Sequence, residues 1–252
     1  MVECERSSWL LRTGLHSAHI FTKTAFMVMS PVHPALIIAI DGPAAAGKGT
    51  LARHIANRYG LAFLDTGGLY RGVAWTMLEA GQDPADRELA AKAAQSFRID
   101  SIEGADIRTR AVGAAASIVA VNPDVRTALL EFQRRFAIDP PPMSDGSAHR
   151  GAVLDGRDIG TVVCPDAHLK LFVTASARAR AHRRWLELIQ HNPALQEDTV
   201  LSDIEARDAR DAGRDAAPLT CADDAHLIDT THLSIDAAFA AVRPLIDPLL
   251  AD

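Results

Sequence analysis

The sequence predicts a three-layer α/β fold, in which a central parallel sheet carries helices on both faces. Two observations predict it. An Ile-rich apolar run at residues 36–41 leads through a glycine-bounded loop into apolar residues at helical spacing that end at Gly60. Further short apolar runs then alternate with helical patterns, which is typical of parallel sheets. The chain has 252 residues, of which 48% are hydrophobic, so one domain can bury a substantial core.

The loop after the first predicted strand has the residues of a phosphate-binding loop. A polyphosphate needs several backbone N–H groups, a helix N-terminus and a cation. Gly42 and Gly47 permit a tight turn, and Lys48 supplies the cation. Gly49 stands where the pattern G-x-x-x-x-G-K-[ST] has a magnesium-binding hydroxyl, and Thr50 follows one position later. An ordinary glycine-rich turn between a strand and a helix is the alternative.

The second predicted strand, residues 61–64, leads into a polar segment and a helix that ends near Gly81. Thr66 can simply cap this helix, and Arg71 can be a solvent-facing residue. The functional alternative places both side chains at the carboxyl end of a strand, where open parallel sheets bind ligands. The two interpretations are compatible.

Residues 84–138 have a mainly helical pattern, interrupted by a short strand-like run at 97–99. Pro123 is expected to begin a helix, because proline favours the first helical position. The proline-rich composition of the following segment predicts a loop over residues 139–151.

The third predicted strand, residues 152–155, ends in Asp155-Gly156. Asp-Gly is a common hairpin turn, so a structural role is possible. A carboxylate at a strand end beside a phosphate loop can instead hold magnesium-bound water. Strands at 169–173 and 226–229 and a helix at 235–245 complete the predicted fold.

A charged helix is predicted between the last two strands. Arg210 and Arg214 lie three and seven residues after Arg207, so the three side chains share one helical face. The interleaved aspartates are also typical of a salt-bridged, solvent-facing surface. Beside a phosphate loop, the same face can be a lid that carries guanidinium groups to a transferring phosphoryl group.

Composition excludes several partners and predicts a cytoplasmic protein. The net charge of -6 provides no overall basic field for nucleic acid or anionic membranes. The apolar runs are far shorter than the about 20 residues that span a bilayer. Cys4, Cys164 and Cys221 lack disulfide or zinc-site spacing. Residues 1–34 lack a secretory apolar core and are expected to be a disordered extension, unless Met27 or Met29 is the true start.

Four segments together resemble those of bacterial cytidylate kinases: residues 41–50, 64–71, 155–163 and 207–211, in the family's order. The resemblance covers roughly residues 36–248. It implies a P-loop nucleoside monophosphate kinase that transfers the γ-phosphoryl group of ATP to CMP or dCMP with Mg²⁺, and a monomer is expected. The implied parts are a core at 35–80 and 152–252, a nucleoside-monophosphate-binding insertion at about 81–138 and a helical lid at about 185–218.

The resemblance also implies roles for individual residues. Thr66, Arg126 and Asp158 match the family's cytosine contacts, since the cytosine amino group needs an acceptor and its carbonyl a donor. The other implied substrate-binding residues are Tyr70, Arg71, Ser117 and Asp211, and the implied catalytic residues are Lys48, Arg157, Arg207 and Arg214. The implied ATP-binding residues are Gly42, Pro43, Ala44, Ala45, Ala46, Gly47, Lys48, Gly49 and Thr50, and the implied metal-binding residues are Thr50 and, through water, Asp155.

Four departures from the family pattern are visible. The loop at 139–151 is long, the stretch at 97–107 is short for the strands of the family's insertion, residues 1–34 are extra, and Ala212 and Gly213 replace an arginine and an asparagine of some members. Another small-molecule kinase and a non-enzymatic nucleotide-binding module stay as alternatives. A GTP-dependent switch would explain the D-x-x-G match at 65–68, but the chain has no Asn-Lys pair for the guanine-reading motif.

Overall fold

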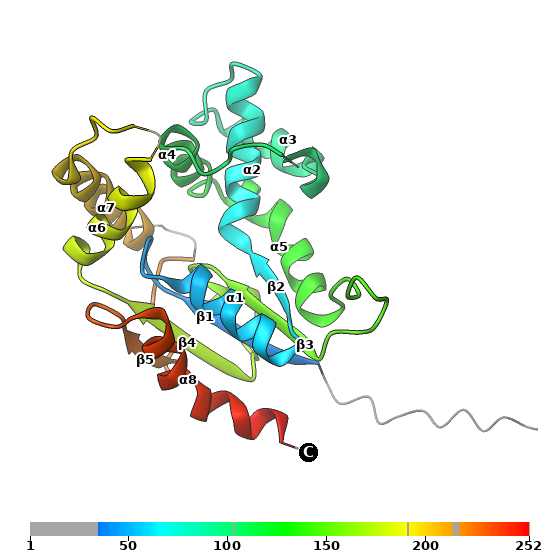
Figure 1. The fold of residues 1–252 in the computed structure, drawn as a ribbon. Coiled ribbons are helices and arrows are strands. Elements are labelled where there is room, and N and C mark those ends of the chain that lie inside the picture. The colour runs from blue at the N-terminus through cyan, green and yellow to red at the C-terminus, as the bar shows by residue number, and fades with distance from the viewer. Residues whose placement is uncertain (1–34, 103, 191, 214–216, 252) are drawn as a thin grey trace, which may run out of the picture. The chain divides into compact units, whose positions relative to one another are not determined.

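The computed structural model describes residues 35–102, 104–190, 192–213 and 217–251. Pro34–Asp252 form one compact unit, which contains a sheet of five parallel strands in the order β2-β3-β1-β4-β5 (Figure 1). The strands are β1 (Leu36–Asp41), β2 (Ala62–Asp65), β3 (Gly151–Asp155), β4 (Leu169–Thr174) and β5 (His226–Asp229). The predicted α/β class with its parallel sheet is therefore confirmed.

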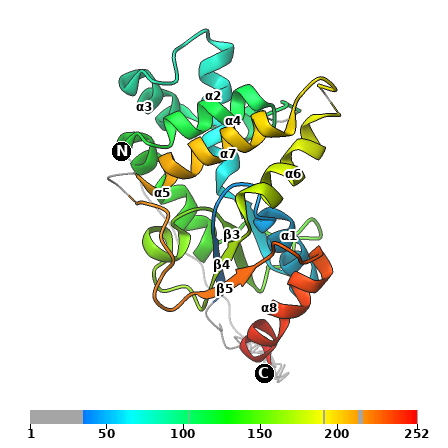
Figure 2. The same cartoon turned by 90° about the vertical axis from the view of Figure 1, so that its left-hand side faces the viewer.

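Helices cover both faces of this sheet, as Figures 1 and 2 show. On one face, α1 (Lys48–Tyr59) and α8 (Ile235–Leu250) pack against side chains such as Ile38 and Ile40. On the other face, α5 (Pro123–Ile138) and the π-helix η2 (Ile159–Val163) pack around Ala39. Successive residues of β1 thus alternate between two buried layers, which explains why the strand is apolar up to Asp41.

Two groups of helices lie beyond the carboxyl ends of the strands (Figure 2). The first group shares one apolar cluster and consists of α2 (Thr66–Glu79), α3 (Arg87–Ser96), α4 (Arg110–Val119) and the N-terminal part of α5. The second group is α6 (Ala177–Leu188) with α7 (Glu197–Ala212), which pack through Ala181, Val200 and Ile204. Among the described residues, no helix is both long and apolar enough to cross a membrane.

The prediction of a short strand at residues 97–99 is wrong. Phe97 caps α3 and the short 3-10 helix η1 (Ile99–Ile102) follows it. The Phe97 ring packs against α2 so closely that a Cβ atom on Gly72 would lie 2.4 Å from it. Phe97 therefore serves helix packing rather than a strand ladder, whereas Ile99 is exposed.

Three smaller expectations are also corrected. Asp155-Gly156 is not a hairpin turn, because both neighbours of β3 run parallel to it. Thr66 is not the cap of α2, since the Asp65 side chain accepts the Gly68 N–H at 3.0 Å and Thr66 begins the helix. Finally, α8 continues past the predicted end, with Pro244 and Pro248 inside it.

Candidate active site

Three neighbouring strands end in aspartates at the same edge of the sheet. Asp65 and Asp155 are paired in the register of β2 and β3, and Asp41 ends the adjacent strand β1. The carboxyl edge of a parallel sheet is the usual ligand site of such folds. In this sheet, the side chains of three aspartates come together at that edge.

The loop between β1 and α1 follows a path that glycine allows. Gly42 has a φ of 141°, and a Cβ atom there would lie 1.9 Å from the carbonyl oxygen of Val173. Gly47 has a φ of 85° and caps α1. Ala45 also adopts a positive φ, 59°, which is uncommon for a residue with a side chain. The expected tight turn is confirmed, and it aims the N-terminus of α1 into the site.

Lys48 lies inside this loop rather than in solvent. Its side chain is 5% exposed, and its Nζ donates a hydrogen bond of 2.9 Å to the Pro43 carbonyl. The Asp155 Oδ1 atom lies 3.7 Å away. Burial lowers the pKa of Lys48 to about 8, helped by the positive charges of Arg157 and Arg207 and opposed by Asp155. Three cations thus influence one another at the loop, an arrangement suited to a polyanion.

Asp155 has a buried oxygen available for a ligand. Its Oδ1 atom makes no hydrogen bond to any described residue, and burial raises the pKa of this carboxyl. A Cβ atom on Gly49 would lie 3.0 Å from Oδ2, so glycine leaves room beside the carboxylate. The exposed Thr50 lies in the first turn of α1.

Among the described residues, no group of three or more His, Cys, Asp or Glu side chains is placed to hold a metal ion. Mg²⁺ at nucleotide sites commonly takes most of its ligands from water and phosphate oxygens, with one or two from protein. Asp155 and Thr50 therefore fit such an ion only together with a nucleotide.

The residues at the end of β2 are tied to the same edge. Thr66 is buried, and its Oγ1 donates a hydrogen bond of 2.7 Å to the Asp155 carbonyl. The Arg71 guanidinium donates to Asp65 at 2.7 Å, and Arg108 lies 3.7 Å from the same carboxylate. Ion pairing with Arg71 outweighs the effect of burial and lowers the pKa of Asp65.

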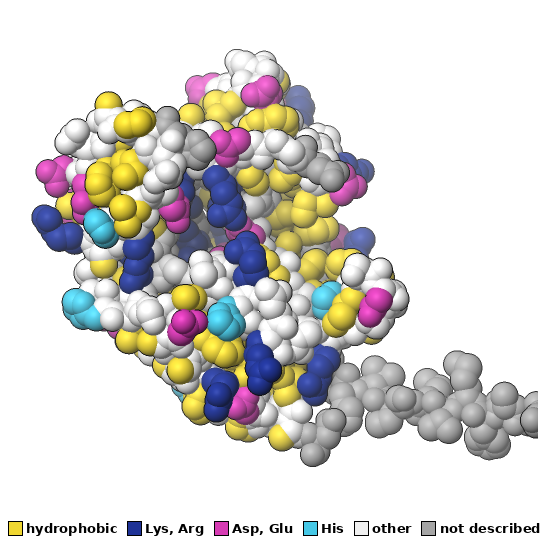
Figure 3. Space-filling model, viewed as in Figure 1, with side chains coloured by type: hydrophobic (Ala, Val, Ile, Leu, Met, Phe, Trp, Pro, Cys, Tyr) yellow, Lys and Arg dark blue, Asp and Glu magenta, His cyan; other side chains and the backbone are white. Residues whose placement is uncertain are grey.

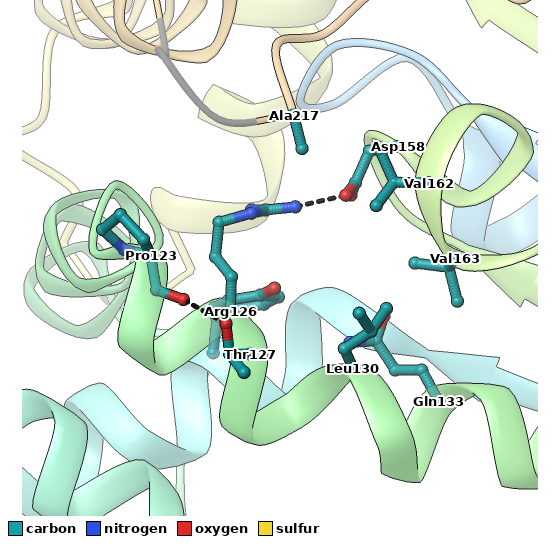
Figure 4. A pocket seen from close by; sticks show the side chains of 10 residues that line it. Pro123, Arg126, Thr127, Leu130, Gln133, Asp158, Val162, Val163 and Ala217 are labelled. Atoms are coloured by element: carbon teal, nitrogen blue, oxygen red, sulfur yellow. Dashed lines mark hydrogen bonds and ion pairs between the residues drawn. The ribbon is translucent and has the colours of Figure 1, made fainter.

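A pocket lies between α5 and the segment after β3 (Figure 4). Arg126 of α5 extends across it and makes a hydrogen-bonded ion pair with Asp158. The guanidinium carbon of Arg126 also lies 5.7 Å from the ring centre of Tyr70. The other lining residues are Pro123, Thr127, Leu130, Gln133, Val162, Val163 and Ala217. A donor and an acceptor therefore share a pocket with mostly apolar walls.

Two aspartates of α7 pair with arginines, both from other elements and from α7 itself. Asp211 is fully buried and accepts a hydrogen bond of 3.1 Å from Arg157, while Arg207 Nε lies 3.9 Å from it. Asp208 accepts two hydrogen bonds from Arg180, of 3.1 and 2.6 Å. The solvent-facing alternative for this charge run is therefore wrong for these residues. Arg214 lies outside the described residues.

Contacts also join α4 to α7. Arg210 Nε donates to Ser117 Oγ at 3.0 Å, and Ser117 is buried. Arg110 makes a two-pronged ion pair with Asp203, with distances of 2.6 and 2.9 Å. Figure 3 shows Lys and Arg side chains around a hollow between the α6–α7 pair and the first helix group.

The sequence analysis missed the buried Arg180. Its guanidinium donates to the Ala44 carbonyl of the phosphate loop at 3.2 Å, and it joins that loop to α7 through Asp208. Arg178, Arg183 and Arg184 surround it in the sequence, so no local signal distinguishes it. Asp41 was also given no role of its own, although it belongs to a segment that carries the family resemblance and directly precedes the loop.

Comparisons with known proteins give one consistent result. A family model described as cytidylate kinase matches residues 38–247. A cytidylate kinase of Granulibacter bethesdensis is 53% identical over 211 residues, which are 84% of this chain and 96% of that protein. A cytidylate kinase of Methylocella silvestris is 52% identical over 84% of this chain and 94% of its own length. A cytidylate kinase of Paramagnetospirillum magneticum is 53% identical over 83% of this chain and 97% of its own length.

Proposed function

This chain belongs to the cytidylate kinase family, and we propose that it transfers the γ-phosphoryl group of ATP to CMP or dCMP, giving ADP and CDP or dCDP. The observation in the structure that carries this proposal is the pocket shared by Arg126 and Asp158, beside a phosphate loop that contains Lys48. A base with one donor edge and one acceptor edge suits the pocket, and a polyphosphate suits the loop.

We propose that the parts of the molecule divide this work. The sheet with α1 and α8 is the core that holds the donor. Residues 81–138, which include α3, α4 and α5, form the acceptor-binding insertion, and the lid lies at about 185–218, which includes α7. The contacts of Arg110 with Asp203 and of Arg210 with Ser117 support a closed arrangement of these two parts.

Base recognition follows from the polarity of three side chains. Asp158 can accept the amino N–H of cytosine, and Arg126 can donate to the ring carbonyl. The Thr66 hydroxyl already donates its hydrogen to the Asp155 carbonyl, so its oxygen is left as an acceptor. Uracil has a carbonyl in place of the amino group and would meet two acceptors, which is the basis of selection against UMP.

Phosphoryl transfer needs positioning and charge stabilisation more than covalent catalysis. We propose that Lys48 and the loop amides hold the phosphates of ATP, while Arg71 and Arg157 hold the acceptor phosphate. An oxygen of the acceptor phosphate forms the new bond to the γ-phosphorus as the bond to the β-bridging oxygen breaks, and ADP leaves. Arg207, together with Arg214 outside the described residues, would stabilise the charge on the transferring group.

We propose that Mg²⁺ accompanies ATP. When bound, it would neutralise charge on the β- and γ-phosphates. Thr50 would contribute its hydroxyl and Asp155 would act through bound water. The buried Asp155 oxygen without a hydrogen bond supports this assignment. Tyr70, Ser117 and Asp211 would complete the acceptor site around the base and sugar. The predicted cytoplasmic location and monomeric state stay predictions.

The test is magnesium-dependent ADP formation from ATP with CMP, dCMP, UMP, AMP and shikimate offered separately. We expect CMP and dCMP to stimulate turnover well above the others. Turnover with shikimate or AMP instead would identify another small-molecule kinase on the same core. ATP binding without stimulation by any acceptor would favour a nucleotide-binding module and contradict the proposed function.

A further inference from the structure

Asp41 is a buried carboxylate to which the proposed mechanism gives no role. It ends β1, directly before the phosphate loop, and is 5% exposed. Its two oxygens accept the backbone N–H groups of Ile159, at 2.8 Å, and Gly160, at 2.7 Å. Hydrogen bonds to a carboxylate are roughly twice as strong as those between neutral groups. One side chain thus fixes a segment more than 100 residues away in the sequence.

Those two N–H groups begin the π-helix η2, whose N-cap residue is Asp158. An aspartate at an N-cap usually turns its own side chain back onto the helix. Asp158 makes no such bond, and its carboxylate instead reaches Arg126 across the pocket. Asp41 therefore takes over the capping of η2, and this leaves the Asp158 carboxylate directed into the pocket.

The other end of η2 is also held. The Arg134 guanidinium of α5 donates to the carbonyls of Val162, at 2.9 Å, and Val163, at 3.1 Å. Val162 and Val163 line the same pocket as Asp158, as Figure 4 shows. The π-helix is therefore one wall of the pocket, fixed at its start by Asp41 and at its end by Arg134.

We propose that Asp41 is a positioning residue for selection of the acceptor base: its ionised carboxylate holds η2 so that Asp158 faces the base. This inference rests on the proposed function. Since Asp41 also precedes the phosphate loop, it connects the donor side of the site to the wall that reads the acceptor. Its loss should affect discrimination between bases more than ATP binding.

Protonation of Asp41 provides an independent readout. Burial raises the pKa of Asp41 to about 6, and the negative charge of Asp158 adds to this rise. The N–H groups of Gly160 and Ile159 and the positive charge of Lys48 lower the pKa and offset part of the rise. The Lys170 stem and Asp41 both lie close to Gly160, and the Asp41 charge also reaches the thiols of Cys164 and Cys221. Below this pH the carboxyl loses its charge and one of its two oxygens becomes an O–H donor, which weakens its hydrogen bonds to the two N–H groups of η2.

The experiment compares the kcat/KM values for CMP and UMP as a ratio from pH 5 to 8, for the wild type and Asp41→Asn. Both substrates carry the same phosphate, so its titration cancels in the ratio. We expect the wild-type ratio to fall as pH drops through about 6, as Asp41 loses its charge. In Asp41→Asn the ratio should be about 10-fold lower at pH 8 and independent of pH, because the amide NH₂ opposes one backbone N–H.

Two further variants sharpen the result. Asp139→Asn removes an exposed carboxylate at the end of α5 and should leave the ratio unchanged. Arg134→Met should lower the ratio as well, since it frees the other end of η2. The KM for ATP should change less than about threefold in Asp41→Asn, because the loop glycines and Lys48 remain.

An unchanged CMP-to-UMP ratio in folded Asp41→Asn overturns the inference, as does an equal rise in the KM for ATP. If this variant does not fold, the wild-type profile decides, and a ratio that is constant from pH 5 to 8 overturns it. A wild-type enzyme that shows no preference for CMP contradicts the proposed function itself. The two failures are therefore distinguishable.

Discussion

Two buried ion pairs of the site, one on each side, differ in how they are made. Lys48 and Asp155 lie 3.7 Å apart, too far for a direct hydrogen bond, and their side chains are 5% and 12% exposed. Arg126 and Asp158, which are 11% and 8% exposed, make a direct hydrogen-bonded contact. The two pairs are similarly buried, but only Arg126 and Asp158 are joined by a direct hydrogen bond. We call this the closed pair, and Lys48 with Asp155 the open pair.

The difference fits the ligand that we propose for each side. A buried carboxylate oxygen without a hydrogen bond is costly unless a ligand completes it, and the phosphate loop leaves Asp155 in that state. The Arg126 and Asp158 pair is complete without a ligand, and its remaining donors and acceptors can still contact a base. With the proposed roles, the Lys48 and Asp155 pair would be completed by the donor, whereas the Arg126 and Asp158 pair is already in place before the acceptor binds.

The largest effect is expected from breaking the open pair at its cation. Lys48→Ala should lower kcat/KM for ATP by about 10³-fold or more, because a cation on the transferring phosphates is lost from a buried site. Steady-state ADP formation measures this. Lys92→Ala is the matched control, since Lys92 is exposed and pairs with Glu88 in the same helix. Near-normal activity of Lys48→Ala would contradict the role of the phosphate loop.

Breaking the closed pair should change selection rather than donor binding. Asp158→Ala should lower the preference for CMP over UMP by about 10²-fold, because the acceptor for the cytosine amino group is lost. The KM for ATP should stay close to that of the wild type. Competition assays with both acceptors give the ratio directly, and an undiminished preference for CMP would refute the role of Asp158 in reading the base.

Removing the carboxylate of Asp155 should weaken the binding of Mg²⁺. Asp155→Asn should raise the Mg²⁺ concentration for half-maximal rate by about 10-fold, as is usual when a group that orients metal-bound water is lost. A magnesium titration at saturating ATP and CMP measures the shift. Asp223→Asn, an exposed carboxylate, serves as control. The same magnesium dependence in Asp155→Asn and wild type would remove Asp155 from the proposed metal site.

The Lys48 ammonium of the open pair should lose its proton within the pH range of an ordinary activity assay. The pKa of Lys48 is lowered to about 8, so the free enzyme loses this positive charge as pH rises above that value. We expect kcat/KM for ATP to be roughly 10-fold below its plateau at pH 9, since this constant reports groups of the free enzyme. Lys48→Arg stays charged and should show no decline between pH 8 and 9, whatever its absolute rate. A parallel decline in both proteins would assign the titration to another group.

Much of this molecule could be predicted from local sequence. The five strands were placed within about a residue or two, because runs such as 36–41 are apolar on both faces and end in glycine or charged residues. The turn at Gly42 and Gly47 was also predictable, since only glycine tolerates the close approach and the positive φ there. The failures lay where a local pattern had a tertiary use, as with Phe97, whose ring packs on Gly72.

The sequence by itself therefore determined the sheet, the tight glycine loop between β1 and α1 and the family resemblance, because each depends on residue types at short, fixed spacing. Only the tertiary structure decided which charges meet. It paired Arg180 with the phosphate loop, Arg157 with Asp211, and Asp41 with the N–H groups of η2. Such contacts join residues far apart in the chain, and the order of strands in the sheet, rather than any local pattern, brings their partners together.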